Sequence, residues 1–147
     1  MFKHILVPTD GSTLSLRAAK SAVRFAKVHG ARITGFYAAP EYHANVAGDY
    51  LPANFVPLEV FQTQIKKTAD KYLDQIKKLA AVGGVPCSGV YSSGDSPYEA
   101  IIKAAKDNKC DLIFMASHGR SGLAGLLIGS ETNKVLTHCK LPVLVYR

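Results

Sequence analysis

Residues 112–130 read LIFMASHGRSGLAGLLIGS, an apolar run followed by a loop that contains four glycines. The apolar run predicts a buried strand over 111–115, and the residues after the loop predict a short helix over 131–138. Glycines let the backbone approach a ligand closely, and a helix start offers unpaired N–H donors at the positive end of its dipole. This strand, loop and helix therefore predict an anion-binding site, and a phosphate group is the expected anion.

The rest of the chain alternates short apolar runs with helical patterns. Further strands are expected over 5–7, 32–38, 85–91 and 143–145, and further helices over 13–29, 56–82 and 97–106. Gly30 suits the end of the first helix, and Ser96 with Pro97 suits the start of the third. Residues 40–55 contain prolines, a glycine and two asparagines, which predict a long loop.

This alternation predicts one α/β domain over residues 1–147. The expected architecture is a doubly wound, Rossmann-like sheet of five parallel strands with helices on both faces. The expected strand order is 3-2-1-4-5, because right-handed crossovers leave only a few doubly wound orders.

A second polar loop, Pro8-Thr9-Asp10-Gly11-Ser12, follows the first expected strand. Ligands of such sheets bind beyond the carboxyl ends of the strands, at the point where the strand order reverses. If strands one and four are neighbours, this loop faces the glycine loop across one crevice. Asp10 is either a turn residue or a hydrogen-bond acceptor for the ligand, and its position favours the second role. A P-loop lysine motif is absent, and no G-x-G-x-x-G follows the first strand.

Composition narrows the class of protein further. The net charge is +7, which indicates an anionic partner without identifying it. The lysines over 66–78 fall on the polar side of an amphipathic helix, so a solvated face is favoured over a nucleic-acid surface. Neither a signal peptide nor a membrane-spanning run is evident, so a cytoplasmic location is expected. Cys87, Cys110 and Cys139 are widely spaced, which argues against zinc or disulfides and favours buried apolar roles.

At this point the chain resembles the ATP-binding branch of the universal stress protein family. The resemblance rests on ILVPTDGS over 5–12, MASHG over 115–119 and LPVLV over 141–145. The nucleotide motif of the family is G-x2-G-x9-G-[ST], and Gly119, Gly129 and Ser130 match it here. Ala116 stands at the first glycine, where its methyl group is expected to crowd the ribose and weaken binding at most.

The resemblance implies ATP as the ligand, with Mg²⁺ or Mn²⁺ arriving on its phosphates. Asp10 is assigned to adenine or ribose, and Ala38 either contacts the adenine edge through its backbone or merely ends a strand. Arg120 either offsets phosphate charge or is solvated. Glu131 suits the helix dipole but would repel a phosphate if it turned inward. The residues expected at the nucleotide are Pro8, Thr9, Asp10, Ala38, Met115, Ala116, His118, Gly119, Arg120, Gly129, Ser130, Glu131 and Thr132.

The family resemblance also implies a homodimer that pairs the last strands, 143–145, in an antiparallel manner. An apolar sheet edge invites such pairing. An apolar patch formed by Leu123, Leu126, Leu127 and Ile128 either packs beneath the glycine loop or meets a partner chain.

Three functions remain open. The first is a cytoplasmic ATP-binding stress-response protein that acts as a nucleotide-dependent regulatory module with at most slow hydrolysis. The second is a slow ATPase or nucleotidyl-transfer enzyme, by analogy of fold alone. The third is a nucleotide-free scaffold. Catalysis by Ser117 and His118 is not expected, because neighbouring loop residues seldom reach each other productively and no G-x-S-x-G elbow is present.

Overall fold

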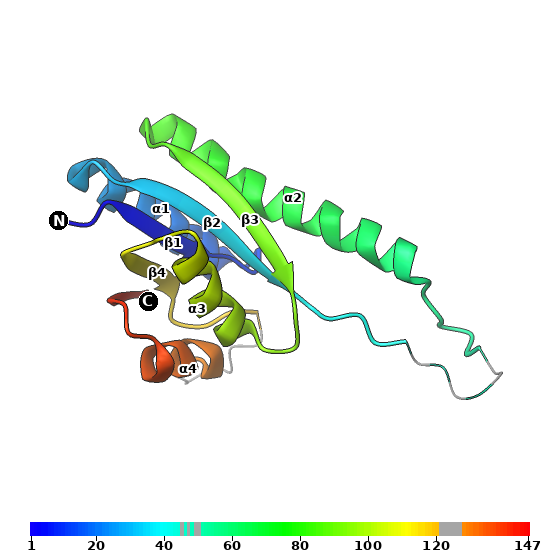
Figure 1. Cartoon of the computed structure of the whole chain (residues 1–147). Helices are drawn as coiled ribbons and strands as arrows, with labels where there is room; N and C mark the ends of the chain where they lie inside the picture. The colour runs from blue at the N-terminus through cyan, green and yellow to red at the C-terminus, as the bar shows by residue number, and fades with distance from the viewer. Residues whose placement is uncertain (45, 47, 49–50, 121–127) are drawn as a thin grey trace.

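Five parallel strands form a sheet in the order β3-β2-β1-β4-β5 in the computed structural model of the chain (Figure 1). The structure describes residues 1–44, 46, 48, 51–120 and 128–147. The strands are β1 (His4–Pro8), β2 (Arg32–Ala39), β3 (Cys87–Ser93), β4 (Leu112–Ala116) and β5 (Val143–Tyr146). The helices are α1 (Thr13–His29), α2 (Leu58–Gly83), α3 (Pro97–Asp107) and α4 (Ser130–His138). The expected fold class and strand order are confirmed.

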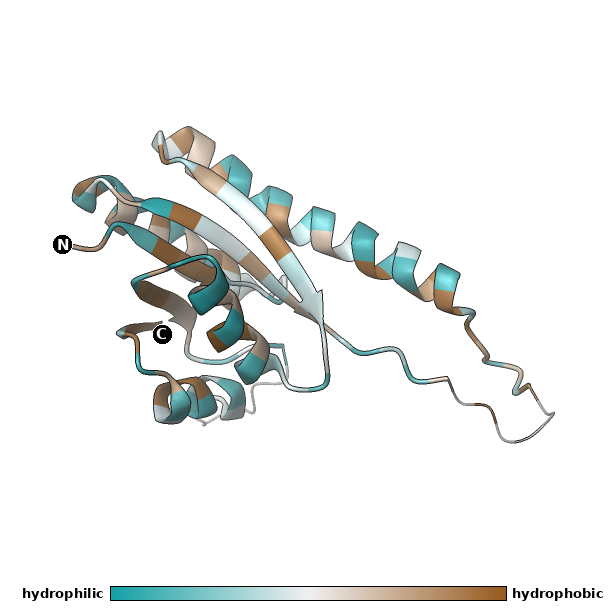
Figure 2. Ribbon diagram, viewed as in Figure 1, coloured by the Kyte–Doolittle hydropathy of each residue, from teal (hydrophilic) through white to brown (hydrophobic). Residues whose placement is uncertain are grey.

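Helices cover both faces of the sheet and bury two hydrophobic cores. On one face, α1 and α2 pack against Ile5, Val7, Ile33 and neighbouring strand residues. On the other, α3 and α4 pack against Leu6, Phe36 and their neighbours. Alternate residues of each strand point to opposite faces, which is why β1 contributes to both cores. Figure 2 shows hydrophobic and hydrophilic residues alternating along α2, as a helix with one buried side requires.

The third strand begins and ends two residues later than the sequence predicts. Gly84 ends α2 in the left-handed conformation, with φ of 68°, and the Val85 N–H donates to the Ala80 carbonyl at 2.9 Å. Val85 therefore completes the end of the helix instead of starting the strand. The helix itself begins at Leu58, and the described residues between β2 and α2 form no helix or strand.

Burial of the cysteines matches the expectation only in part. Cys110 is buried, whereas Cys87 and Cys139 are half-buried, and all three are free thiols. Burial raises the pKa of Cys110 to about 11, because the thiolate is poorly solvated there.

Strand β1 lies at the centre of the sheet and pairs with β2 on one side and β4 on the other. The expected neighbours, strands one and four, are therefore adjacent. The loops that follow them leave the same edge of the sheet, where the strand order reverses. Within the described ranges, no helix is both long and apolar enough to cross a bilayer.

Candidate functional site

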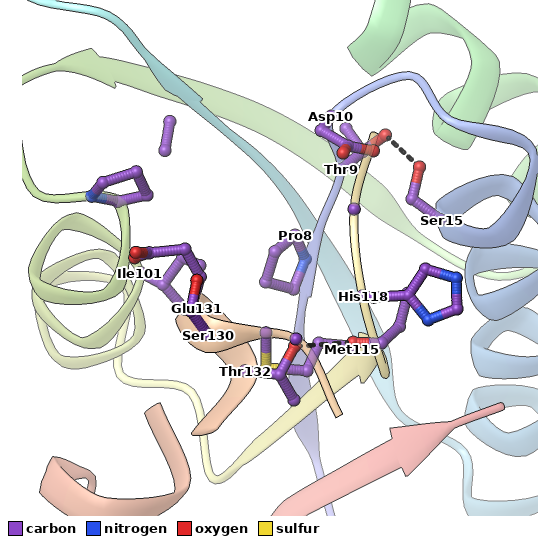
Figure 3. A pocket seen from close by; sticks show the side chains of 15 residues that line it. Pro8, Thr9, Asp10, Ser15, Ile101, Met115, His118, Ser130, Glu131 and Thr132 are labelled. Carbon is purple, nitrogen blue, oxygen red and sulfur yellow. Dashed lines mark hydrogen bonds between the residues drawn. The ribbon is translucent and has the colours of Figure 1, made fainter. Parts of the chain in front are cut away.

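A cavity of about 420 Å³ opens at the carboxyl ends of β1, β2 and β4 (Figure 3). Twelve of the thirteen residues expected at a nucleotide line it, and Arg120 is the exception. Three further lining residues, Ser15, Pro97 and Ile101, were not expected. The lining residues are Pro8, Thr9, Asp10, Ser15, Ala38, Pro97, Ile101, Met115, Ala116, His118, Gly119, Gly129, Ser130, Glu131 and Thr132.

Asp10 joins the two loops of the cavity. One carboxylate oxygen, Oδ1, accepts a hydrogen bond from the Ser12 N–H at 3.0 Å, and Oδ2 accepts one from the Arg120 N–H at 2.7 Å. Burial acts to raise the pKa of Asp10, but hydrogen bonds from Ser12 and the Arg120 backbone outweigh it, so the pKa lies below its ordinary value. Asp10 is thus ionised, and its carboxylate connects the β1 loop to the glycine loop through hydrogen bonds.

Arg120 turns away from the cavity. Its guanidinium carbon lies over the ring of Tyr72, 5.4 Å from the ring centre, as in a cation–π contact. Tyr72 also packs edge-on against Tyr37, with ring centres 5.2 Å apart. The structure therefore does not bring the Arg120 side chain to the place where a phosphate was expected, because an aromatic surface from α2 holds it.

The start of α4 closes one side of the cavity. Gly129, not Ser130, is the N-cap residue, and it has no side chain to cap the first N–H groups of the helix. The Thr132 hydroxyl donates to the Ala116 carbonyl at 3.0 Å, which fixes the helix to the end of β4. Ser130 is the first residue within the helix.

The model of the universal stress protein family matches residues 1–147. The chain belongs to the universal stress protein family.

Relatives of this universal stress protein span its whole length. It is 32% identical over 151 residues to universal stress protein YxiE of Bacillus subtilis, covering all of both chains. It is 33% identical over 147 residues to a universal stress protein of Thermus aquaticus, again covering all of both chains. The solved structure of MJ0577 of Methanocaldococcus jannaschii superposes with a TM-score of 0.80 at 28% identity, covering 99% of this chain and 95% of that one.

Glu131 bridges the starts of two helices beside the cavity. Its Oε2 accepts a hydrogen bond from the Tyr98 N–H in the first turn of α3 at 2.9 Å, and its Oε1 lies 2.9 Å from Lys134 Nζ. Ser96 occupies the N-cap position of α3 as expected, but its side chain makes no capping bond. The Glu131 carboxylate, which is 33 residues from Tyr98 in sequence, therefore accepts the hydrogen bond that a side-chain cap from Ser96 would accept.

Ser117 and His118 do come within hydrogen-bonding distance, with 3.1 Å between Ser117 Oγ and His118 Nδ1. The two side chains therefore reach each other, although a productive contact between these loop neighbours was not expected. Ser117 is nevertheless only 2% exposed and is absent from the cavity lining. The His118 ring points away from Ser130 and Glu131 (Figure 3). A buried hydroxyl cannot reach a substrate in the cavity, so the pair does not form a nucleophile and base there.

Ala116, which replaces the first glycine of the family motif, ends β4 and is buried. Its side chain belongs to the core on the α1 face, together with Leu112 and Phe114. Met115 lies on the opposite face, with α3. Ala116 thus belongs to the core and also lines the cavity, and its effect on a ribose stays a prediction.

The three unexpected lining residues come from helices. Ser15 lies in the first turn of α1, where its hydroxyl is 3.2 Å from that of Thr9. Pro97 and Ile101 stand four residues apart on one face of α3. That spacing, directly after a strand of the same sheet, is the signal in the sequence that identifies a helix face beside the site.

The expected apolar patch lies largely outside the described residues. Leu123, Leu126 and Leu127 of the apolar patch are not described, and Ile128 is 39% exposed. Among the described side chains, no cluster of three histidine, cysteine or acidic residues could hold a metal ion.

Proposed function

We propose that this universal stress protein binds an adenine nucleotide, with ATP as the ligand that its motif indicates, and acts as a nucleotide-dependent regulatory module. The observation that carries the proposal is the convergence of twelve of the thirteen expected residues around one cavity at the switch point of the sheet. The volume, about 420 Å³, lies within the range of small-molecule sites.

The lining supplies both kinds of contact that a nucleotide needs. Pro8, Ala38, Ile101 and Met115 offer apolar surface for a base. Gly129 and Ser130 bring the start of α4, which lacks a side-chain cap, to the cavity wall, where N–H donors and the helix dipole favour a phosphate. A divalent cation such as Mg²⁺ or Mn²⁺ would enter with the phosphates rather than in a protein cage.

Known structures are compatible with this assignment. Among proteins of the same fold, one universal stress protein was solved in complex with cAMP and an Arabidopsis thaliana member with AMP bound. Their identities to this chain are 23% and 16%, so they support the fold and illustrate what this fold accommodates.

We expect the protein to hydrolyse ATP slowly at most. Both Asp10 oxygens are engaged by backbone N–H groups, and Ser117 is buried away from the cavity. We place the protein in the cytoplasm as a homodimer, with strand β5 as the pairing edge.

The test is binding of ATP to protein freed of nucleotide. We expect isothermal titration calorimetry to give one site per chain, and mass spectrometry of denatured, gently purified protein to release an adenine nucleotide. No heat and no thermal shift at millimolar ATP would instead favour a nucleotide-free scaffold. Steady turnover with Mg²⁺ would favour the slow enzyme.

A further inference from the structure

The cavity carries negative charge of its own. Two carboxylates, from Asp10 and Glu131, line it, and its described lining includes neither lysine nor arginine. Residues 121–127, which complete the glycine loop, contain no charged residue in the sequence. The one cation of this loop, Arg120, lies over Tyr72. Phosphates in this site would therefore be held by backbone and hydroxyl groups, without a cationic side chain from the wall.

Two helix starts border the cavity, but at one of them an N–H group already binds a carboxylate. Pro97 of α3 and Ser130 of α4 both line it. At α3 the Tyr98 N–H already binds the Glu131 carboxylate at 2.9 Å, whereas Gly129 leaves the start of α4 without a side-chain cap. Only one of the two positive helix ends is thus open to a ligand phosphate, and it begins one residue before Glu131.

Lys134 offsets the Glu131 charge only in part. Its side chain is 49% exposed, its Nζ lies 2.9 Å from Glu131 Oε1 and 5.5 Å from the centre of the Tyr98 ring, and it does not line the cavity. The Glu131 side chain is 37% exposed and lines the cavity, so water screens the Lys134 ammonium more than the Glu131 carboxylate. A phosphate bound at Ser130 would therefore experience a net repulsion from the neighbouring Glu131 carboxylate.

We propose that Glu131 is a specificity-determining residue that disfavours each added phosphate charge, so that the site discriminates against metal-free ATP relative to AMP. This inference rests on the proposed nucleotide-binding function. The repulsion grows with the charge of the ligand, because Coulomb energy scales with the product of the two charges. It weakens when Mg²⁺ neutralises part of the phosphate charge.

The experiment measures dissociation constants of AMP and ATP by calorimetry, in EDTA and in Mg²⁺, for wild type and Glu131→Gln. The glutamine carbonyl keeps an acceptor for the Tyr98 N–H while the charge is lost. We expect the ratio of the ATP constant to the AMP constant in EDTA to fall roughly tenfold in Glu131→Gln. We also expect Mg²⁺ to improve ATP binding less in this variant than in wild type.

Glu99→Gln is the matched control. Glu99 lies in the same first turn of α3, is exposed and accepts from the Tyr98 hydroxyl, but does not line the cavity. We expect its ratio to equal that of wild type. A second variant, Glu131→Asp, keeps the charge beside the cavity, so its ratio should lie closer to that of wild type than to that of Glu131→Gln.

The outcomes separate the two proposals. An unchanged ratio in Glu131→Gln, with both nucleotides still bound, overturns the role of Glu131 and leaves nucleotide binding intact. An equal fall in Glu99→Gln assigns the effect to long-range charge, and an equal fall in Glu131→Asp assigns it to side-chain length; either overturns the inference. Absence of binding by both nucleotides to every variant overturns the proposed function and the inference together.

Discussion

Two glycines of the cavity wall, Gly119 and Gly129, are needed because a side chain would not fit there. Neither adopts a backbone conformation that is restricted to glycine. Gly129 has φ of −70°, which any residue can adopt, and Gly119 is not among the described residues with positive φ. A Cβ on Gly119 would collide with the Asp10 carboxylate. A Cβ on Gly129 would lie 3.1 Å from both Cα and Cβ of His118. The motif glycines thus let the β1 loop, the glycine loop and α4 approach one another.

At Gly129 the close approach predicts a measurable loss of binding. Replacement by valine should push the start of α4 away from His118 and from the Ser117 carbonyl, which accepts the Gly129 N–H at 2.6 Å. We expect the free energy of unfolding to fall by roughly 1–3 kcal/mol, as in other overpacked sites. Nucleotide affinity should fall more than tenfold, because a displaced helix start no longer faces the phosphate. Urea unfolding and calorimetry measure the two effects.

Gly94 provides the control for this substitution. It lies in the loop after β3, its φ is not positive, and an added Cβ would meet no atom within 4 Å. We expect Gly94→Val to retain nucleotide affinity. If folded Gly129→Val binds ATP as tightly as wild type, then Gly129 only shapes the turn before α4 and is not required for nucleotide binding.

At the level of strands, a row of polar side chains crosses the sheet near its amino end. His4 Nε2 of β1 lies 2.7 Å from Thr34 Oγ1 of β2, which in turn lies 3.1 Å from Ser88 Oγ of β3. His4 is 8% exposed, and its Nδ1 has no hydrogen-bond partner among the described residues. Burial and then the positive charge of Arg32 lower the pKa of His4 below its ordinary value, although Asp111 opposes this.

This row predicts a dependence of stability on mildly acidic pH. The unfolded chain binds a proton at His4 near pH 6.5, before the folded protein does, because the folded pKa is lower. Stability should therefore decrease as the pH falls below about 6.5 toward the folded pKa. Urea unfolding at about pH 7.5 and about pH 5.5 should show a smaller difference for His4→Gln than for wild type.

His43→Gln is the comparison for the histidine experiment. His43 pairs with Asp95 at 2.7 Å, but both side chains are more than half exposed, so solvent screens the pair. Its removal should leave most of the pH dependence in place. A pH dependence that survives in His4→Gln would assign the effect to other groups.

The elements were predictable from sequence where local chemistry decides them. Apolar runs located all five strands, and Gly30, with φ of 60°, ends α1 as expected. The boundary between α2 and β3, near Val85, differs from its predicted place. The reason is that a backbone N–H there can donate a hydrogen bond either within the helix end or to the neighbouring strand.

The residues that line the cavity were predictable as a set, but the hydrogen bonds among them were not. The glycine spacing and the Pro8–Ser12 loop located the cavity wall. The contacts that define its charge join residues far apart, such as Asp10 with Arg120 and Glu131 with Tyr98. Local sequence contains no information about which distant donor a carboxylate meets. That is why a phosphate contact remained one alternative for Arg120, and why the contact of Glu131 with the first turn of α3 was not expected.

At the scale of the whole molecule, the edge strand β5 determines how two copies could associate. Ser117 N–H donates to the Tyr146 carbonyl and Ile113 N–H to the Pro142 carbonyl, so even-numbered residues of this segment face β4. A residue of a strand directs its N–H and C=O to the same side, and the side alternates along the chain. Val143 and Val145 therefore direct their backbone groups outward, where a second copy would pair.

This direction decides which proline tests the proposed dimer. Proline at Leu144 would remove a donor that faces β4 and should damage the fold, whereas proline at Val145 removes a donor that faces outward, a position where edge strands tolerate proline. Both chains of a two-fold antiparallel dimer carry the Val145→Pro substitution. The dimer therefore loses two hydrogen bonds of about 1 kcal/mol each. We expect light scattering to find wild type as a dimer and Val145→Pro shifted toward a monomer of similar thermal stability. A wild-type monomer at high micromolar concentration, or a Val145→Pro variant that remains fully dimeric, would place any self-association away from this edge.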